Sequence, residues 1–346
     1  MAVPTPHHPA PPGDPVEEQA PPEERSSRPA RPGAYLARRF LRFLLSLLLL
    51  VTATFGMVHV VPGDPVRAAL GITASPELVA ARTHELGLDL PVWEQYARYA
   101  AGLFSGDLGT SMISGLPVSQ TIADRLPYTV MLALVAFAVV MVTAIPAGMA
   151  AAAWTRGGRG RAAELLFTGA SGLLAVVPEF LLAVAMIVLF AVTWELLPVA
   201  NVSGSLTPSY YVLPTLALAV GPAAALARIV RVEALSVLSS DFMRTARAKR
   251  LPARLIYLRH ALPNLLTGAL TIGGLLISGL VAGSVLVENV FVWPGLGSAL
   301  VEAIKAKDYP VVQGVVLVYG GAVLLVNLAV DVALGRLDPR STIKED

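Results

Sequence analysis

The sequence predicts an all-α membrane protein with six transmembrane helices. Of its 346 residues, 55% are hydrophobic and only 14% are charged, whereas an ordinary soluble protein has roughly 25% charged residues. With a mean hydropathy of +0.66, a water-soluble domain would have too few charges to cover its surface. The apolar residues are gathered into long runs, and basic residues cluster between these runs on alternate sides.

Six apolar runs are long enough to cross the hydrocarbon core of a bilayer, which takes roughly 20 helical residues. Backbone groups in lipid must find their hydrogen bonds within the segment, so runs of this length are expected to be helices. Transmembrane strands would be about half as long and would alternate in polarity, which excludes a barrel. The predicted helices are Leu41–Val61, Thr129–Trp154, Leu165–Thr193, Val212–Val232, Leu265–Val287 and Val311–Leu334.

The chain before the first run is expected to be a disordered cytoplasmic tail. Residues 1–33 hold ten prolines with glutamates between them and offer no apolar face to bury. The first apolar run starts only near Leu41, is preceded by arginines and is followed by no small-residue cleavage site. Residues 34–61 are therefore interpreted as a retained signal anchor and not as a cleaved signal peptide.

The positive charges place both termini in the cytoplasm. Segments 155–163 and 233–260 carry three and six basic residues, whereas 194–211 has none and 289–310 has two lysines. The long connection 62–125 counts for little in this rule. The predicted organisation is a tail (1–33), a first transmembrane helix (34–61), an extracytoplasmic segment (62–125), a transmembrane core (126–335) and a cytoplasmic C-terminal tail (336–346).

Several kinds of chemistry are excluded by what the sequence lacks. It has no cysteine, and therefore no thiolate metal site and no cysteine nucleophile. No Gly-Lys pair occurs, so there is no Walker phosphate loop, and the five histidines are too dispersed for a metal site. The net charge of +2 does not indicate nucleic acid. The chain is expected to be no enzyme and to hold no cofactor, so any energy from ATP must come through a partner.

Polar residues inside the runs are candidates for a translocation path, because a charge facing lipid is costly. Glu179 follows Pro178 in the middle of the third run, and Asn327 and Asp331 share one face of the last run. The alternative for each is a hydrogen bond to a neighbouring helix, and it is preferred for Asp331, close to the end of its run. Gly279–Gly283 fits a close contact between helices.

Two connections are too long to be simple turns. In 62–125, Pro91–Phe104 has the pattern of an amphipathic helix, with Trp93 and two tyrosines suited to a membrane interface. In 233–260, the stretch Phe242–Leu258 mixes basic and apolar residues. Such a loop is expected to bind either lipid headgroups, which would make membrane lipid its partner, or a groove on a protein.

Residues 241–263 resemble the cytoplasmic "EAA" loop of permease subunits from binding-protein-dependent ABC importers. Arg244-Thr245-Ala246 stands at the Glu-Ala-Ala positions, Arg250 at the glycine and Leu262-Pro263 at the Leu-Pro. The likeness to the dipeptide/oligopeptide B-type permeases spans roughly residues 35–340. Its further motifs are Pro62–Pro65, Gly106–Ser111, Arg125–Pro127, Glu288–Phe291, Trp293–Gly297 and Asp308–Gln313.

The resemblance implies the type I ABC importer permease fold in a bacterial cell membrane, working by alternating access. It implies a second (C-type) permease subunit, two cytoplasmic ATP-binding subunits and an extracytoplasmic solute-binding protein as partners. The implied solutes are di- and oligopeptides, with nickel, haem or glutathione as alternatives. The competing hypothesis from another class is a lone ion-coupled secondary transporter, which the EAA-like loop and the lack of an internal repeat disfavour.

The resemblance also implies that the loop couples the permease to the ATPases. Apolar Phe242, Leu251 and Leu255 are expected to anchor it, and Arg244, Arg247 and Lys249 to meet acidic or polar groups. The family's glycine would occupy a turn with positive φ, which costs Arg250 on the order of 1 kcal/mol, and Pro252 is expected to begin the next helix. The candidate coupling residues are Phe242, Arg244, Thr245, Ala246, Arg247, Ala248, Lys249, Arg250, Leu251 and Leu255.

Overall fold

The computed structural model describes residues 32–60, 65–71, 73–156, 160–199 and 207–337. Every regular element in these ranges is a helix, which confirms the all-α prediction for the part of the chain that is described. The proline-rich tail up to residue 31, most of the Pro62–Pro65 motif and the last nine residues lie outside it.

Five of the six predicted crossings are found as continuous helices. In the described chain, these five helices are each long and apolar enough to span a membrane without a neighbour. They are α1 (Pro32–Val60), α5 (Val118–Thr155), α8 (Pro208–Ser239), α11 (Leu262–Val290) and α13 (Tyr309–Leu337). Two internal prolines in each of α5 and α8 do not interrupt these helices.

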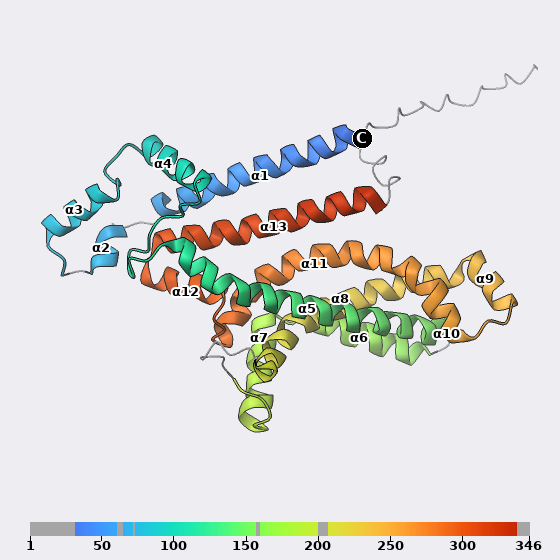
Figure 1. The fold of residues 1–346 in the computed structure, drawn as a ribbon. Helices are drawn as coiled ribbons and strands as arrows, with labels where there is room; N and C mark the ends of the chain where they lie inside the picture. The colour runs from blue at the N-terminus through green and yellow to red at the C-terminus, as the bar shows by residue number, and fades with distance from the viewer. Residues whose placement is uncertain (1–31, 61–64, 72, 157–159, 200–206, 338–346) are drawn as a thin grey trace, which may run out of the picture.

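The third predicted crossing is not one continuous helix, so the expectation for Leu165–Thr193 is wrong in this respect. It consists of α6 (Arg161–Val176), α7 (Glu179–Met186) and the π-helix η2 (Ile187–Thr193), with a bend of 98° after α6. Pro178 has no N–H to donate and disfavours a helical conformation for the residue before it. Together α6, α7 and η2 form either a sixth, broken span or a re-entrant segment, and α7 projects from the bundle (Figure 1).

Helix α8 is the centre of the bundle and packs against α5, α6, α7 and α11. Its largest contact is with α5, where Leu132, Val140, Leu218 and Leu226 are buried in one apolar core. The two backbones approach closely at Gly148, because a Cβ atom there would lie 2.5 Å from the Ala227 carbonyl oxygen. This glycine therefore sets the distance between the two longest helices.

Gly148→Ala is expected to destabilise the chain by roughly 1–3 kcal/mol, the usual cost of overpacking. The added methyl group would also meet the Val230 side chain at 2.8 Å. Gly279→Ala on α11 is the matched control, since no atom lies within 4 Å of its added Cβ. Thermal unfolding of the purified chain in one detergent compares the two variants, and equal midpoints would contradict the close approach at Gly148.

Helix α1 lies alongside α13 at the periphery (Figure 1). An ion pair of 2.8 Å joins Arg39 Nη1 to Asp331 Oδ2. Toward the other end, the Gln313 amide donates to the Thr54 carbonyl oxygen at 3.1 Å. Between them, Gly320 leaves room for Leu50. The first helix is thus fixed to the last one at three levels.

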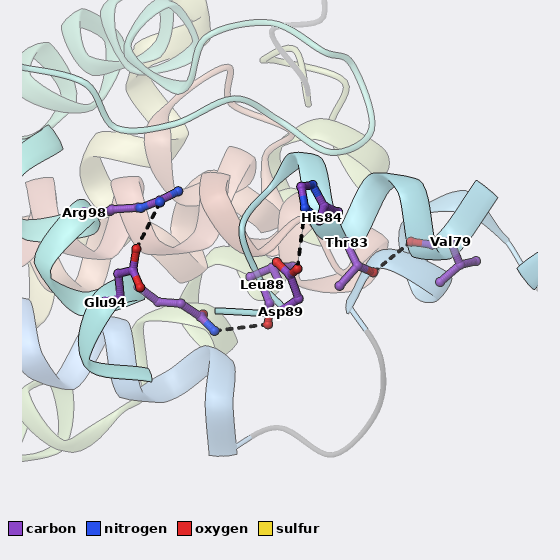
Figure 2. A network of polar contacts seen from close by, with 8 residues as sticks. Val79, Thr83, His84, Leu88, Asp89, Glu94 and Arg98 are labelled. Atoms are coloured by element: carbon purple, nitrogen blue, oxygen red, sulfur yellow. Dashed lines mark hydrogen bonds and ion pairs between the residues drawn. The ribbon is translucent and has the colours of Figure 1, made fainter. Parts of the chain in front are cut away.

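The segment after α1 forms α2 (Pro65–Leu70), α3 (Pro76–Glu85) and α4 (Val92–Phe104). The last of these confirms the amphipathic helix predicted over Pro91–Phe104. The rings of Tyr96 and Tyr99 pack against Phe55 of α1, while Trp93 is 77% exposed. Figure 2 shows the polar contacts of this segment, among them Arg98 with Glu94 and His84 with Asp89.

Candidate functional site

The loop between α8 and α11 folds into two short helices, α9 (Asp241–Ala248) and α10 (Ala253–Leu255), followed by the π-helix η3 (Ile256–Ala261). Helix α9 is amphipathic, and Met243 and Ala246 on its inner face are buried. Met243 packs in a cluster with Leu238 at the end of α8 and Ile256 of η3. These contacts fix α9 to the end of the central helix.

The outer face of α9 is exposed and combines one aromatic ring with basic groups. Phe242 is 48% exposed, and Arg244 lies beside Asp241 with 3.3 Å between Nη1 and Oδ1. The other exposed candidates in this loop are Thr245, Ala248, Lys249 and Arg250. An apolar anchor surrounded by cationic side chains is suited to an acidic or polar groove on a protein.

Three of the predicted coupling residues also serve the chain itself. Arg247 is half-buried, and its guanidinium donates to the carbonyl oxygens of Met243, at 3.0 Å, and Leu238. It thereby satisfies a carbonyl at the C-terminal end of α8. Leu251 packs against the Met243 cluster, and Leu255 is half-buried.

Arg250 has φ of +52° between α9 and α10. The positive φ expected for this position is confirmed, although an arginine stands there. Pro252 is the residue before α10 and not its first residue, and its carbonyl oxygen accepts from the N–H groups of Leu255 and Ile256. The proline therefore precedes the helix and accepts its first hydrogen bonds, which corrects the expected position.

Arg250→Gly is expected to raise the stability of the chain by about 1 kcal/mol, because glycine adopts positive φ without the steric cost of a side chain. The Arg250 side chain is exposed, so little packing is lost. The unfolding midpoint of the purified chain measures the effect. Lys249→Gly is the control. Lys249 has φ of −74°, so glycine relieves no strain there and only raises the conformational entropy of the unfolded chain, which is expected to lower the midpoint.

The structure separates the three candidates for a translocation path. Asp331 pairs with Arg39, and Asn327 accepts a hydrogen bond of 3.0 Å from Ser278 of α11. Both therefore tie helices together, as the alternative interpretation expected. Glu179 is different: it is half-buried at the start of α7 beside Gly283 and makes no hydrogen bond among the described residues.

A second polar cluster, at the other end of the bundle, was not singled out from the sequence. Glu288 at the end of α11 is completely buried, and its Oε2 accepts from the Gly297 N–H at 2.6 Å. Its main-chain carbonyl accepts from the Trp293 N–H at 2.7 Å. A Cβ atom at Gly295 would collide with the Glu288 carboxylate, so the glycines of this motif make room for the buried acid.

Three further motifs, Gly106–Ser111, Arg125–Pro127 and Asp308–Gln313, have residues in the same region. Asp308 accepts from the Ser111 hydroxyl and, at 3.0 Å, from the Met112 N–H, which joins two motifs far apart in sequence. Arg125 reaches Ser298 and Glu302 of α12 (Leu296–Ala306) at 3.4 and 3.5 Å. Figure 1 shows α12 at the end of the bundle opposite to α9 and α10. The α9–α10 loop therefore lies at one end of the bundle, and the buried Glu288 cluster with α12 lies at the other (Figure 1).

Comparison with known proteins covers nearly all of this architecture. A family model described as "Binding-protein-dependent transport system inner membrane component" matches residues 144–343, and its N-terminal counterpart matches residues 34–133. The glutathione transport system permease protein GsiC of Pectobacterium atrosepticum is 37% identical over 88% of this chain and 97% of its own length. GsiC of Salmonella paratyphi A is 37% identical and GsiC of Escherichia coli K12 is 35% identical, with the same coverage.

Proposed function

The chain belongs to the family of inner-membrane components of binding-protein-dependent transport systems, and on that premise we propose that it imports peptides, with glutathione as the first solute to test. As a permease of an ABC importer it is a multi-pass protein of the bacterial inner membrane. It forms half of a translocation pathway that works by alternating access. Both chain termini and the α9–α10 loop lie on the cytoplasmic side.

Three kinds of partner follow from membership in an importer family: ATP-binding subunits, a solute-binding protein and a second permease. The importer has two ATP-binding subunits, and we place one of them at the α9–α10 loop of this chain and the solute-binding protein at the opposite end, near α12 and the Gly106–Ser111 motif. The second permease is a related C-type chain that completes the pathway.

The observation that carries the proposal is the construction of α9. Its outer face offers Phe242 and basic side chains to an ATPase groove, while its inner face is bound to α8 through Met243 and Arg247. A rigid helix that follows the ATPases as they close around ATP would therefore displace the end of α8. Since α8 packs on α5, α6, α7 and α11, its displacement would reach every helix of the central bundle.

Two observations suggest the solute, and both point to a small peptide. The motifs resemble those of di- and oligopeptide permeases, and the named relatives are glutathione permeases. Glutathione is itself a peptide with a free amine and free carboxylates. The proposed solute class is therefore a small peptide with both charged termini, delivered by the binding protein.

Affinity purification of the chain from its native membrane tests the proposal. We expect a second permease and ATP-binding subunits in stoichiometric amounts, and ATP hydrolysis that a solute-loaded binding protein stimulates. Replacing Arg244–Lys249 by alanines should release the ATP-binding subunits and keep the second permease. Recovery of the chain alone from several mild detergents, with no associated ATPase, would favour the lone ion-coupled transporter.

A further inference from the structure

We propose that Arg228 of α8 lines the translocation path and binds a carboxylate of the transported solute; this inference rests on the proposed function. Arg228 lies inside a helix long and apolar enough to cross the membrane, and its side chain is exposed. Within the described chain it makes no hydrogen bond or ion pair. A charge in such a place needs water, a partner charge or a ligand.

The next arginine on the same helix shows what a structural role looks like here. Arg231 is 12% exposed, and its Nη2 lies 2.6 Å from Glu164 Oε1 and 3.0 Å from the Thr155 hydroxyl. Thr155 ends α5, and Glu164 lies in the first turn of α6. Arg231 therefore joins three helices near the end of the bundle that carries α9, whereas Arg228, one turn further into the bundle, has no such partners.

The direction of the Arg228 side chain argues against a lipid headgroup as its partner. Its Nη1 would lie 3.5 Å from a Cβ atom at Gly172 of α6. Gly172 is eight residues beyond Glu164, which is about 12 Å along a helix. The side chain therefore extends along α6, away from the end that carries α9. An arginine reaching for lipid phosphate at that end would extend the opposite way.

Arg228 also faces a different side of α8 from the apolar groove that this helix lines with α5 and α6. Ala223 and Ala227 face that groove, and Arg228 is about 100° further around the helix than Ala227. On this side Ile229 and Val232 are also exposed. An exposed face of a central helix that carries an arginine among apolar side chains is where a second permease would complete a path.

Glu179 supplies the complementary charge. It begins α7, a helix that packs on both α8 and α11, and its carboxylate lies beside Gly283 without a hydrogen bond among the described residues. A guanidinium can donate two parallel hydrogen bonds to a carboxylate. An unpaired base and nearby acids around α8 suit a zwitterion: the carboxylate of a peptide at Arg228 and its ammonium group at Glu179. Glu233 of α8, whose carboxylate lies beside Gly268 of α11 and also makes no hydrogen bond among the described residues, is a second acid available to the ammonium group.

The absence of cysteine makes the first test direct, because one introduced thiol is unique in this chain. Arg228→Cys in the assembled transporter is expected to react with a hydrophilic, membrane-impermeant thiol reagent applied from the cytoplasmic side, at a rate that changes when ATP binds. Val142→Cys on the apolar α5 is the control, since Val142 is exposed and is expected to face lipid. Labelling does not depend on the identity of the solute, and an Arg228→Cys variant that stays unreactive in every nucleotide state would overturn the proposal.

Uptake by the reconstituted transporter tests the carboxylate contact, with glutathione and its C-terminal amide as probes. Arg228→Ala is expected to lower glutathione uptake at least tenfold, Arg228→Lys less, and the preference of the wild type for the free acid over the amide should disappear. Arg161→Ala, which removes an exposed arginine at the start of α6, is the charge-matched control. An equal loss for acid and amide, a loss that occurs only in anionic lipid, or no loss would refute the contact.

The two proposals fail in different ways. A wild-type complex without hydrolysis stimulated by the binding protein would contradict the importer itself. If that hydrolysis is present and Arg228→Ala transports normally, only the assignment of Arg228 is wrong. Where the wild type does not move glutathione, the labelling result decides.

Discussion

Phe242→Asp is expected to lower ATP-driven uptake and binding-protein-stimulated hydrolysis at least tenfold while the chain stays folded. Phe242 is half exposed on the outer face of α9, so its ring is free for a partner. Burial of a phenylalanine contributes roughly 1.5–3 kcal/mol, and each 1.4 kcal/mol is a factor of ten in affinity. A carboxylate in the same groove would add a desolvation cost. The amount of ATP-binding subunit retained on the purified chain measures the loss.

The neighbouring residue provides the contrast that separates docking from folding. Met243 is fully buried beneath α9, so Met243→Asp should reduce the yield of folded chain before any question of docking arises. Arg161→Ala, an exposed change at the start of α6 and outside the α9–α10 loop, should leave both properties near the wild type. Full ATPase retention by Phe242→Asp would place the docking surface elsewhere on the cytoplasmic side.

The loop between α8 and α11 shows how far sequence reasoning reaches. Its position, its two short helices and the positive φ of Arg250 were implied by the resemblance to the EAA loop, in which a glycine occupies the turn. The inward use of Arg247 could not be predicted, because spacing alone does not show whether a basic side chain reaches a carbonyl at the end of the preceding helix. Only the packed arrangement of α8 and α9 brings the Leu238 carbonyl within its reach.

The break in the third crossing was missed for a related reason. Hydropathy measures the apolar character of a run, and both sides of Pro178 are apolar. A proline alone is also ambiguous, since Pro146 and Pro222 lie inside continuous helices. At Pro178 the preceding residue adopts an extended conformation, with ψ of 123° at Val177. The bend places Glu179 at a helix start beside α11, which a straight helix would not have done.

The polar residues of the last predicted crossing could be singled out from the sequence, unlike the buried acid at the opposite end. Asn327 and Asp331 could be placed on one face by their spacing, and a structural role was already the alternative. Glu288 gave no such signal, because it entered only as part of the Glu288–Phe291 motif and lies just beyond the predicted helix Leu265–Val287. Its hydrogen-bonding partner Gly297 lies nine residues further along the chain, beyond the turn between α11 and α12.

Glu288→Ala is expected to destabilise the chain by at least about 3 kcal/mol. Glu288 is fully buried beside Gly295 and Gly297, so removing its side chain would leave a cavity, and large-to-small changes at buried positions cost about 2–5 kcal/mol. It would also leave the buried Gly297 N–H without its acceptor, a further loss of roughly 1–3 kcal/mol. The fraction of chain that remains monodisperse after extraction, and its unfolding midpoint, measure the effect.

Glu288→Gln distinguishes the shape of this residue from its charge. Glutamine keeps the volume and one oxygen that can accept from Gly297, so the turn between α11 and α12 should persist and the yield should stay within about twofold of the wild type. If Glu288→Gln were as damaging as Glu288→Ala, the charge itself would be required. The Glu288 carboxylate would then have a role besides accepting the hydrogen bond of the turn. The hydroxyls of Tyr319 and Ser284, which lie 3.4 Å apart, would be the first candidates for its partner in that role. If only the alanine variant fails, Glu288 is the acceptor around which this end of the bundle is built, and the surface that we propose for the binding protein depends on it.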